Sequence, residues 1–222
     1  MRARRNKGFL IGSGVFLFLF LMLIFFMSGV QGQLLDEQVA YWAADKDSGI
    51  IGKLMEYASF LGSSELVLLV TVIIGIVLLV ILKWRQLFFF FVVSVGGVFL
   101  NLALKLLIHR ERPGDEAKYI DVFNYQLELQ SYSFPSGHTM RATIFFLFLI
   151  YLVYYFGKRT LTKWILFVLF SLLTIAVPLS RVILDAHFAT DVIGAVFISF
   201  AWFFLCLYFF HKPKETGISF SF

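Results

Sequence analysis

A stretch of twelve residues between two long apolar runs, Ser180–Asp191, combines an arginine, a histidine and two carboxylates. Charged groups at a membrane boundary are costly unless they pair or take part in function. If the second apolar run begins as a helix near Asp185, with Asp185 as its N-cap, His187 and Asp191 lie on one helix face. The carboxylate would then hold one ring nitrogen of His187 and leave the other free to act as a nucleophile.

A second polar cluster, Ser133–His138, reads Ser-Phe-Pro-Ser-Gly-His and comes directly before another apolar run. Proline, Ser136 and Gly137 at a helix start would offer backbone N–H groups and a hydroxyl to an anion, and the helix dipole adds to the attraction. An ordinary N-cap explains Ser136 nearly as well. It does not explain His138 beside it. Arg141, one turn further on, is expected to pair with an acid or a lipid headgroup.

The third cluster lies at the end of a further apolar run, where Lys105 and Arg112 stand seven residues apart and Pro113 follows. On a helix both cations would project from the same side, about 10 Å apart along the axis. Pro113 disfavours helix at Arg112, so we expect the helix to end there. Lys105 alone could equally be a cation that extends to the membrane surface. Asn101, one turn earlier, is either its partner or part of an ordinary interhelical hydrogen bond.

Composition places these clusters in a membrane protein. Apolar residues make up 60% of the chain and aromatic residues 19%, and the mean hydropathy is +0.86, which excludes a soluble domain. We expect one domain, residues 1–222, that is all-α: a six-transmembrane-helix bundle with an extracytoplasmic amphipathic helix after the first span. The first span is too long for a cleaved signal peptide, which is the competing interpretation. The expected spans are Phe9–Val30, Leu66–Leu82, Leu87–Ile108, Thr139–Phe156, Trp164–Ser180 and Val192–Phe210, and the amphipathic segment is Gln33–Ser64.

The charges predict the orientation of the spans. Short basic segments at 2–7, 83–85, 158–163 and 212–214 all fall on one side if the N-terminus is inside, as the positive-inside rule requires. Both termini should then be cytoplasmic, and the three polar clusters should meet at one outer rim. The net charge of +5 is not arranged as a basic stripe interleaved with aromatics, so we expect no nucleic acid partner. The bilayer and its anionic lipids are the expected partners; the oligomeric state is not predicted.

Together the clusters supply two arginines, a lysine, a Ser-Gly backbone nest and two histidines, one of them backed by a carboxylate. Cations and N–H donors in that arrangement suit the oxygens of a phosphoryl group in transit, where positioning and charge stabilisation provide most of the catalysis. An anion channel or transporter would instead need polar or broken helices across the middle of the membrane. A non-catalytic lipid-binding protein would not need both His187 and Asp191.

In order, Lys105-x6-Arg112-Pro113, Pro135-Ser-Gly-His138 and Ser180-Arg181-x5-His187-x3-Asp191 resemble the three-part signature of the type 2 phosphatidic acid phosphatase superfamily, and the six-span layout resembles its bacterial integral-membrane branch. The resemblance implies a membrane lipid phosphatase that acts at the outer face without a metal or other cofactor. Its substrate would be phosphatidylglycerophosphate, phosphatidic acid or undecaprenyl diphosphate.

The resemblance also implies a role for each motif residue. His187 would be the nucleophile that forms a phosphohistidine, Asp191 would orient it, and His138 would protonate the leaving alkoxide and then activate water. The residues expected to hold the phosphate oxygens are Lys105, Arg112, Ser136, Gly137 and Arg181.

Overall fold

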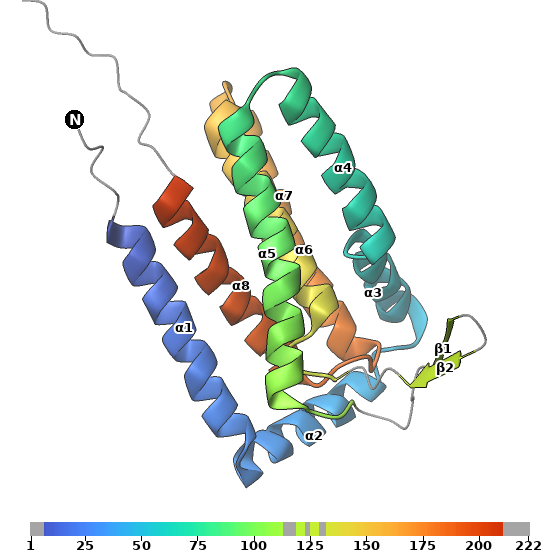
Figure 1. Cartoon of the computed structure of the whole chain (residues 1–222). Helices are drawn as coiled ribbons and strands as arrows, with labels where there is room; N and C mark the ends of the chain where they lie inside the picture. Colours follow the sequence, from blue (N-terminus) through green and yellow to red (C-terminus); the bar gives the residue numbers. More distant parts are fainter. Residues whose placement is uncertain (1–6, 113–118, 123–124, 129–131, 211–222) are drawn as a thin grey trace, which may run out of the picture.

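The computed structural model describes residues 7–112, 119–122, 125–128 and 132–210, which form eight helices and one small hairpin (Figure 1). The all-α prediction is confirmed. The antiparallel hairpin pairs β1, Tyr119–Val122, with β2, Tyr125–Glu128. The helices are α1 Lys7–Met27, α2 Val30–Ala44, α3 Gly49–Leu61, α4 Ser64–Val80, α5 Trp84–Ile108, α6 Gly137–Phe156, α7 Thr160–Ile183 and α8 Ala189–Phe210.

Six helical segments in the described residues are long and apolar enough to cross a membrane, which agrees with the number predicted. The second of them is longer than expected, because α3 and α4 together form one segment, Gly49–Val80. The interfacial helix expected over Gln33–Ser64 is therefore wrong in its second half. Only α2 lies across the end of the bundle (Figure 1), whereas α3 packs along α7. Between α3 and α4, the Ser63 hydroxyl caps the new helix by accepting from Leu66 N–H at 3.2 Å.

The core of the bundle lies around α6 and α8, the two helices with the largest buried share. Aromatic side chains pack in it: the ring centroids of the stacked pair Phe90 and Phe148 are 4.1 Å apart, and Phe89 contacts Phe148 and Phe203 in tilted pairs. The α8 side chain of Trp202 donates to the backbone of α5, from Nε1 to Val93 O at 3.0 Å. These contacts fix the helices that carry the polar clusters relative to one another.

Large apolar side chains cover the outside of the bundle, as a lipid environment requires. Examples on three different helices are Val80, Phe99 and Ile175, which are 73%, 66% and 65% exposed. A soluble protein would bury such residues, so the exposed fractions support a chain that spans the bilayer.

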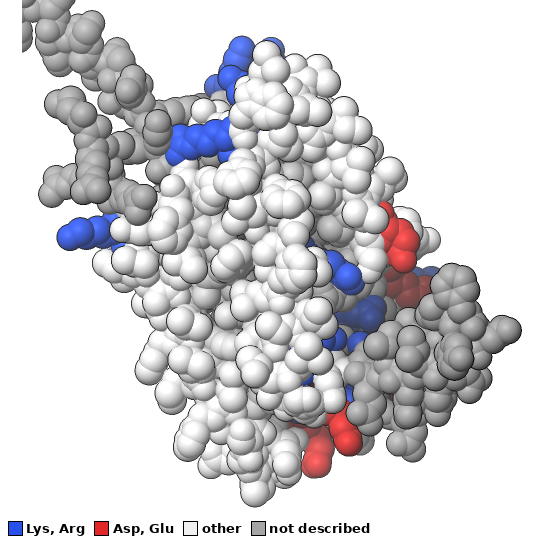
Figure 2. Space-filling model, in the orientation of Figure 1, with Lys and Arg blue, Asp and Glu red and all other residues white. Residues whose placement is uncertain are grey.

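The two ends of the bundle differ in charge. The start of α1, the α4–α5 turn, the α6–α7 turn and the end of α8 lie at one end, and α2 and the α7–α8 loop lie at the other (Figure 1). The first end carries basic residues of the described chain, namely Lys7, Lys83, Arg85, Lys158, Arg159 and Lys163. Figure 2 shows only Lys and Arg among the coloured side chains at this upper end of one face, whereas both signs of charge occur toward the other end.

Candidate active site

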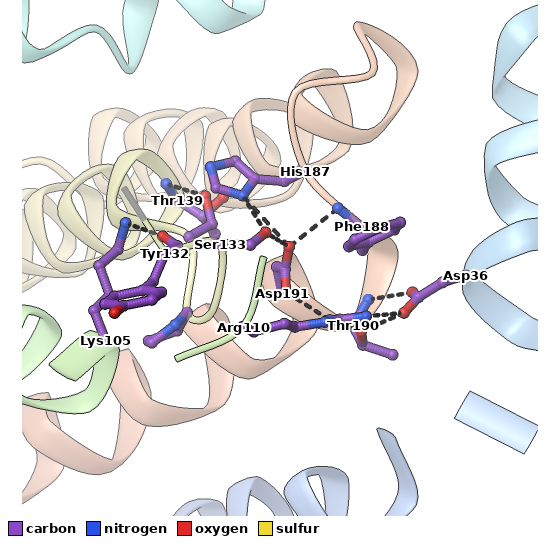
Figure 3. A network of polar contacts seen from close by, with 12 residues as sticks. Asp36, Lys105, Arg110, Tyr132, Ser133, Thr139, His187, Phe188, Thr190 and Asp191 are labelled. Carbon is purple, nitrogen blue, oxygen red and sulfur yellow. Dashed lines mark hydrogen bonds and ion pairs between the residues drawn. The ribbon is translucent and has the colours of Figure 1, made fainter. Parts of the chain in front are cut away.

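The segments that carry the three sequence motifs meet at the end of the bundle crossed by α2 (Figure 3). Asp191, which is fully buried, lies at the centre of their contacts. Its Oδ2 lies 3.5 Å from Nδ1 of His187, and the hydroxyl of Ser133 donates to the same oxygen. The predicted pairing of His187 with Asp191 is therefore present.

The helix that was expected to produce this pairing begins later than predicted. Helix α8 starts at Ala189, so His187 lies in the preceding loop and only Asp191 is helical. Asp191 is in the first helical turn, where its Oδ2 accepts from Phe188 N–H at 3.1 Å and satisfies a donor that the helix itself leaves unpaired. That bond fixes the path of the loop that carries His187.

The N-cap role expected for Asp185 is wrong. Its side chain is exposed, and its φ of 49° places it in the left-handed region just after α7 ends. Aspartate tolerates this conformation better than most residues, because its short polar side chain bonds locally. Asp185 thus turns the chain between α7 and α8 and does not start the second helix.

Burial has a direct effect on the nucleophile candidate. The His187 side chain is 4% exposed, and loss of solvent lowers the pKa of its imidazole below the ordinary value. The hydrogen bond and charge of Asp191 oppose this shift, whereas the positive charges of Arg112 and Lys105 add to it. The balance keeps the ring neutral near pH 7, the state that a nucleophilic imidazole needs.

The positive charges of Lys105 and Arg112 both lower the pKa of His187. Contrary to the prediction, the two residues do not lie on one helix. Helix α5 ends at Ile108, where His109 adopts a left-handed conformation with φ 52° and its N–H bonds to Lys105 O. Arg112 therefore lies beyond the helix, in a segment with no regular secondary structure, and Pro113 lies outside the described residues. Lys105 extends from the last turn of α5, and its Nζ donates to Tyr132 O at 2.6 Å.

The second motif opens α6 as predicted. Ser136 is fully buried and caps the helix by accepting from Thr139 N–H at 3.4 Å, so the N-cap interpretation is confirmed. A Cβ on Gly137 would stand 3.0 Å from Oδ1 of Asn101, a tight contact that the Asn101 side chain would have to move to relieve. Asn101 donates to Pro135 O at 3.0 Å, a bond from α5 to the segment before α6 that holds the motif against α5.

Helix α3 contacts the remaining two motif side chains. Nε2 of His138 lies 3.1 Å from Ser59 O, and Nη1 of Arg181 donates to Ser59 Oγ at 2.8 Å. The buried Nε of Arg181 has no hydrogen-bond acceptor within the described part of the chain. A buried guanidinium donor without an acceptor is what a phosphate oxygen would satisfy. Ser59 was not singled out in the sequence, because its helix was expected to lie at the membrane surface.

Two further side chains that sequence reasoning missed complete the surroundings of Asp191. Arg110 donates to Oδ1 of Asp191 at 2.6 Å and to Asp36 on α2 at the same distance. Asp36 also accepts from the backbone N–H and the hydroxyl of Thr190. The available signal was the position of Arg110 beside the Arg112 motif; nothing in the sequence linked it to Asp36.

A cavity of about 340 Å³ lies between α4, α5 and α6 and continues from the second motif into the apolar part of the bundle. Asn101 and Gly137 line the end next to the motif, and Arg141 lines the wall; most of the other lining residues are apolar. Glu65 is an acid whose charge acts on Arg141. The cavity thus has a polar end beside the second motif and mostly apolar walls.

Metal ligands were not expected here. No group of three His, Cys, Asp or Glu side chains close enough to bind a metal ion is found in the ranges that the structure describes. The groups expected to hold the phosphate oxygens near His187 are cations and N–H donors instead. Metal-independent turnover stays a prediction.

The comparisons with known proteins agree with this geometry. A family model described as PAP2 superfamily matches residues 86–215, which contain all three motifs. Phosphatidylglycerophosphatase B of Bacillus subtilis (strain 168) is 31% identical over 167 residues, or 74% of this chain and 78% of the relative. The crystal structure of a transmembrane PAP2 type phosphatidylglycerolphosphate phosphatase from Bacillus subtilis matches with a TM-score of 0.76 and 28% identity, covering 92% of this chain and 98% of that one. The chain belongs to the PAP2 superfamily and is a multi-pass membrane lipid phosphatase.

Proposed function

We propose that this protein removes the terminal phosphate of phosphatidylglycerophosphate through a phosphohistidine formed on His187. The observation that carries the mechanism is the placement of His187, with Nδ1 toward Asp191 and Ser133 and with Arg112 and Lys105 within electrostatic range. A carboxylate on Nδ1 directs the lone pair of Nε2 away from Asp191 and toward an incoming phosphorus.

The reaction proceeds in two displacements. In the first, Nε2 of His187 forms a bond to phosphorus, the ester P–O bond breaks, and His138 gives a proton to the leaving alkoxide. In the second, His138 takes a proton from water as the water oxygen attacks phosphorus and the P–N bond breaks. Inorganic phosphate leaves and both imidazoles return to their starting states. Lys105, Arg112, Arg181 and the Ser136–Gly137 backbone stabilise the charge on the phosphoryl oxygens.

Two features support phosphatidylglycerophosphate over phosphatidic acid. The relatives named above carry that substrate in their names. In addition, Arg141 lines the cavity about one helical turn, roughly 6 Å, beyond Gly137. A lipid with a second phosphate beyond the one removed could contact Arg141 while its acyl chains occupy the apolar part of the cavity. Phosphatidic acid has no second phosphate to offer.

The proposed orientation places the site at the outer face, with both termini in the cytoplasm. Support comes from the basic turns at the opposite end of the bundle, which the positive-inside rule assigns to the cytoplasm. The orientation is tested in intact cells with a single cysteine introduced at Glu111 or at Lys158. The one natural cysteine, Cys206, is replaced by serine in both variants. A membrane-impermeant maleimide should label the cysteine at position 111 and not the one at 158; the reverse pattern contradicts the orientation.

The function is tested with purified protein in detergent, to which phosphatidylglycerophosphate, phosphatidic acid and undecaprenyl diphosphate are offered in parallel. Released phosphate is measured with and without EDTA, and His187→Ala serves as the inactive control. We expect the highest kcat/KM for phosphatidylglycerophosphate, no effect of EDTA, and an acid-labile phosphate on His187 in quenched samples. A faster reaction with undecaprenyl diphosphate would overturn the substrate, and a phosphoenzyme that survives in His187→Ala would overturn the mechanism.

A further inference from the structure

A buried acid lies on α2, the helix that crosses the end of the bundle, outside all three motifs. Asp36 is 3% exposed, although most residues of the helix around it are exposed. Its carboxylate accepts from Arg110 Nη2 at 2.6 Å, from Thr190 N–H at 2.9 Å and from the Thr190 hydroxyl at 2.7 Å. Burying a charged carboxylate costs desolvation free energy, so buried carboxylates are normally paired with a cation and hydrogen-bonded, as this one is.

One of these contacts places Asp36 at the start of α8. The N–H of Thr190 belongs to the first turn of that helix, where the donors have no partner inside the helix. A negative charge there is also favoured by the helix dipole. Asp36 therefore holds α2 against the helix turn that carries Asp191.

Arg110 connects the two carboxylates. Its Nη2 donates to Asp36 and its Nη1 donates to Oδ1 of Asp191, both at 2.6 Å, which is short for a charge-assisted bond. Nη1 also donates to the Thr190 hydroxyl at 2.6 Å, and the guanidinium lies 4.5 Å from the centre of the Phe188 ring. Figure 3 shows the row Asp36, Arg110, Asp191 ending at His187.

The alternation of charge along this row bears on the reaction. In the proposed mechanism His187 becomes positively charged when it bonds to phosphorus, and the negative charge of Asp191 stabilises that state. Arg110 alone would cancel much of the negative charge of Asp191 at this distance. Asp36 offsets the charge of Arg110 from its other side, so that Asp191 keeps its effect on His187 while Arg110 still holds its oxygen in place.

We propose that Asp36, acting through Arg110, is a positioning residue that sets the orientation and the effective charge of Asp191. The inference rests on the proposed function for the reaction but not on which lipid is the substrate. It makes α2 a fixed part of the catalytic apparatus, because a helix that moved aside to admit lipid would withdraw Asp36 from Arg110 and Thr190.

The test compares kcat and KM of Asp36→Asn, Arg110→Gln and the double variant with the wild type, on whichever lipid the wild type hydrolyses fastest. Asp36→Asn should lower kcat about tenfold and leave KM nearly unchanged, because Asp36 does not touch substrate. Arg110→Gln leaves Asp36 buried without its cation and should be slower still. The double variant removes both charges and should be at least about threefold faster than Arg110→Gln, because charge balance returns.

Glu37→Gln is the matched control, since it removes the same charge from the neighbouring, exposed position of α2 and should leave kcat unchanged. If Asp36 merely anchored α2, the double variant would be the slowest and the least stable to heating, which would overturn the proposal. An Asp36→Asn variant with wild-type kcat, or with a change in KM alone, would do the same.

Arg110→Lys covers the case in which Asp36→Asn does not fold. Lysine keeps the charge but lacks the fork that reaches both carboxylates, so kcat should again fall about tenfold, and a wild-type kcat would overturn the proposal. A wild type that releases no phosphate from any lipid overturns the proposed function and this inference together. A fast wild type with an equally fast Asp36→Asn overturns this inference alone.

Discussion

Replacing the Asp191 carboxylate by an amide, Asp191→Asn, changes the site with almost no change in shape. Oδ1 accepts from Arg110 at 2.6 Å, while Oδ2 accepts from the Ser133 hydroxyl and from Phe188 N–H and faces His187. In the variant one oxygen becomes an NH2 group, which donates. The bond to the charged Arg110 is the stronger contact, so the amide oxygen should stay there and the NH2 group should turn toward His187.

The size of the effect follows from that orientation. An NH2 group beside Nδ1 makes this nitrogen the acceptor, which moves the ring proton to Nε2 and removes the lone pair that attacks phosphorus. The same exchange in serine proteases lowers kcat by about 10⁴, and because the 3.5 Å separation here is longer than a normal hydrogen bond, we expect a loss of about 10²–10³. KM should change by no more than about threefold, because in the proposed mechanism Asp191 contacts His187 and not the phosphate.

The assay is single-turnover formation of the phosphoenzyme, followed by steady-state kcat and KM on the same preparation. Asp185→Asn is the matched control, since it makes the same exchange at an exposed position six residues earlier and leaves the left-handed turn intact, asparagine being equally tolerant of it. Its rate should equal that of the wild type. A rate for Asp191→Asn within about threefold of the wild type, or a loss confined to KM, would refute the assigned role of the carboxylate.

Further predictions concern the other groups of the site. His138→Ala should lower kcat by about 10²–10⁴ with an unchanged thermal unfolding profile, as loss of a general acid requires; phosphoenzyme that forms at the wild-type rate would contradict this. Because burial lowers the pKa of His187, its neutral form persists on acidification, and kcat/KM should decline through loss of this group only below about pH 6.5. An acid-side midpoint above pH 7 that moves when Asp191 is replaced would show that the pKa of His187 is raised. That result would contradict the prediction. Arg141→Gln should lower the preference for phosphatidylglycerophosphate over phosphatidic acid about tenfold. The control Arg85→Gln, at the other end of the bundle, should not change this preference. If both variants show the same preference, Arg141 does not contact the headgroup.

Local properties of the chain sufficed for the number of spans and for the motifs, but not for the start of the second span, where α3 joins α4. A hydrocarbon core demands long apolar helices, so composition within each segment identifies it without knowledge of its neighbours. The residues of the three motifs carry charge and hydrogen-bonding groups that such segments otherwise exclude, which is why His187, His138 and Arg181 stood out.

Errors arose where the backbone depends on contacts between distant segments. Helix α8 begins at Ala189 and not at Asp185, because Asp36 and Asp191 satisfy its first N–H groups. Helix α5 stops at Ile108, one turn before the motif arginine, at a left-handed His109. Neither boundary has a strong local signal, since the residues involved are compatible with helix on their own.

The sequence by itself determined that this chain has six apolar segments long enough to cross a membrane and carries a set of cations and histidines that we expect to bind phosphate. Only the tertiary structure decided which groups surround the proposed nucleophile and general acid: Ser133 and Arg110 on Asp191, Ser59 beside His138, and Asp36 behind Arg110. The physical reason is that hydropathy and motif spacing are properties of neighbouring residues, whereas the partner of a buried charge is chosen by packing. Asp36 and Arg110 are 74 residues apart in the chain, and no periodicity or spacing relates them.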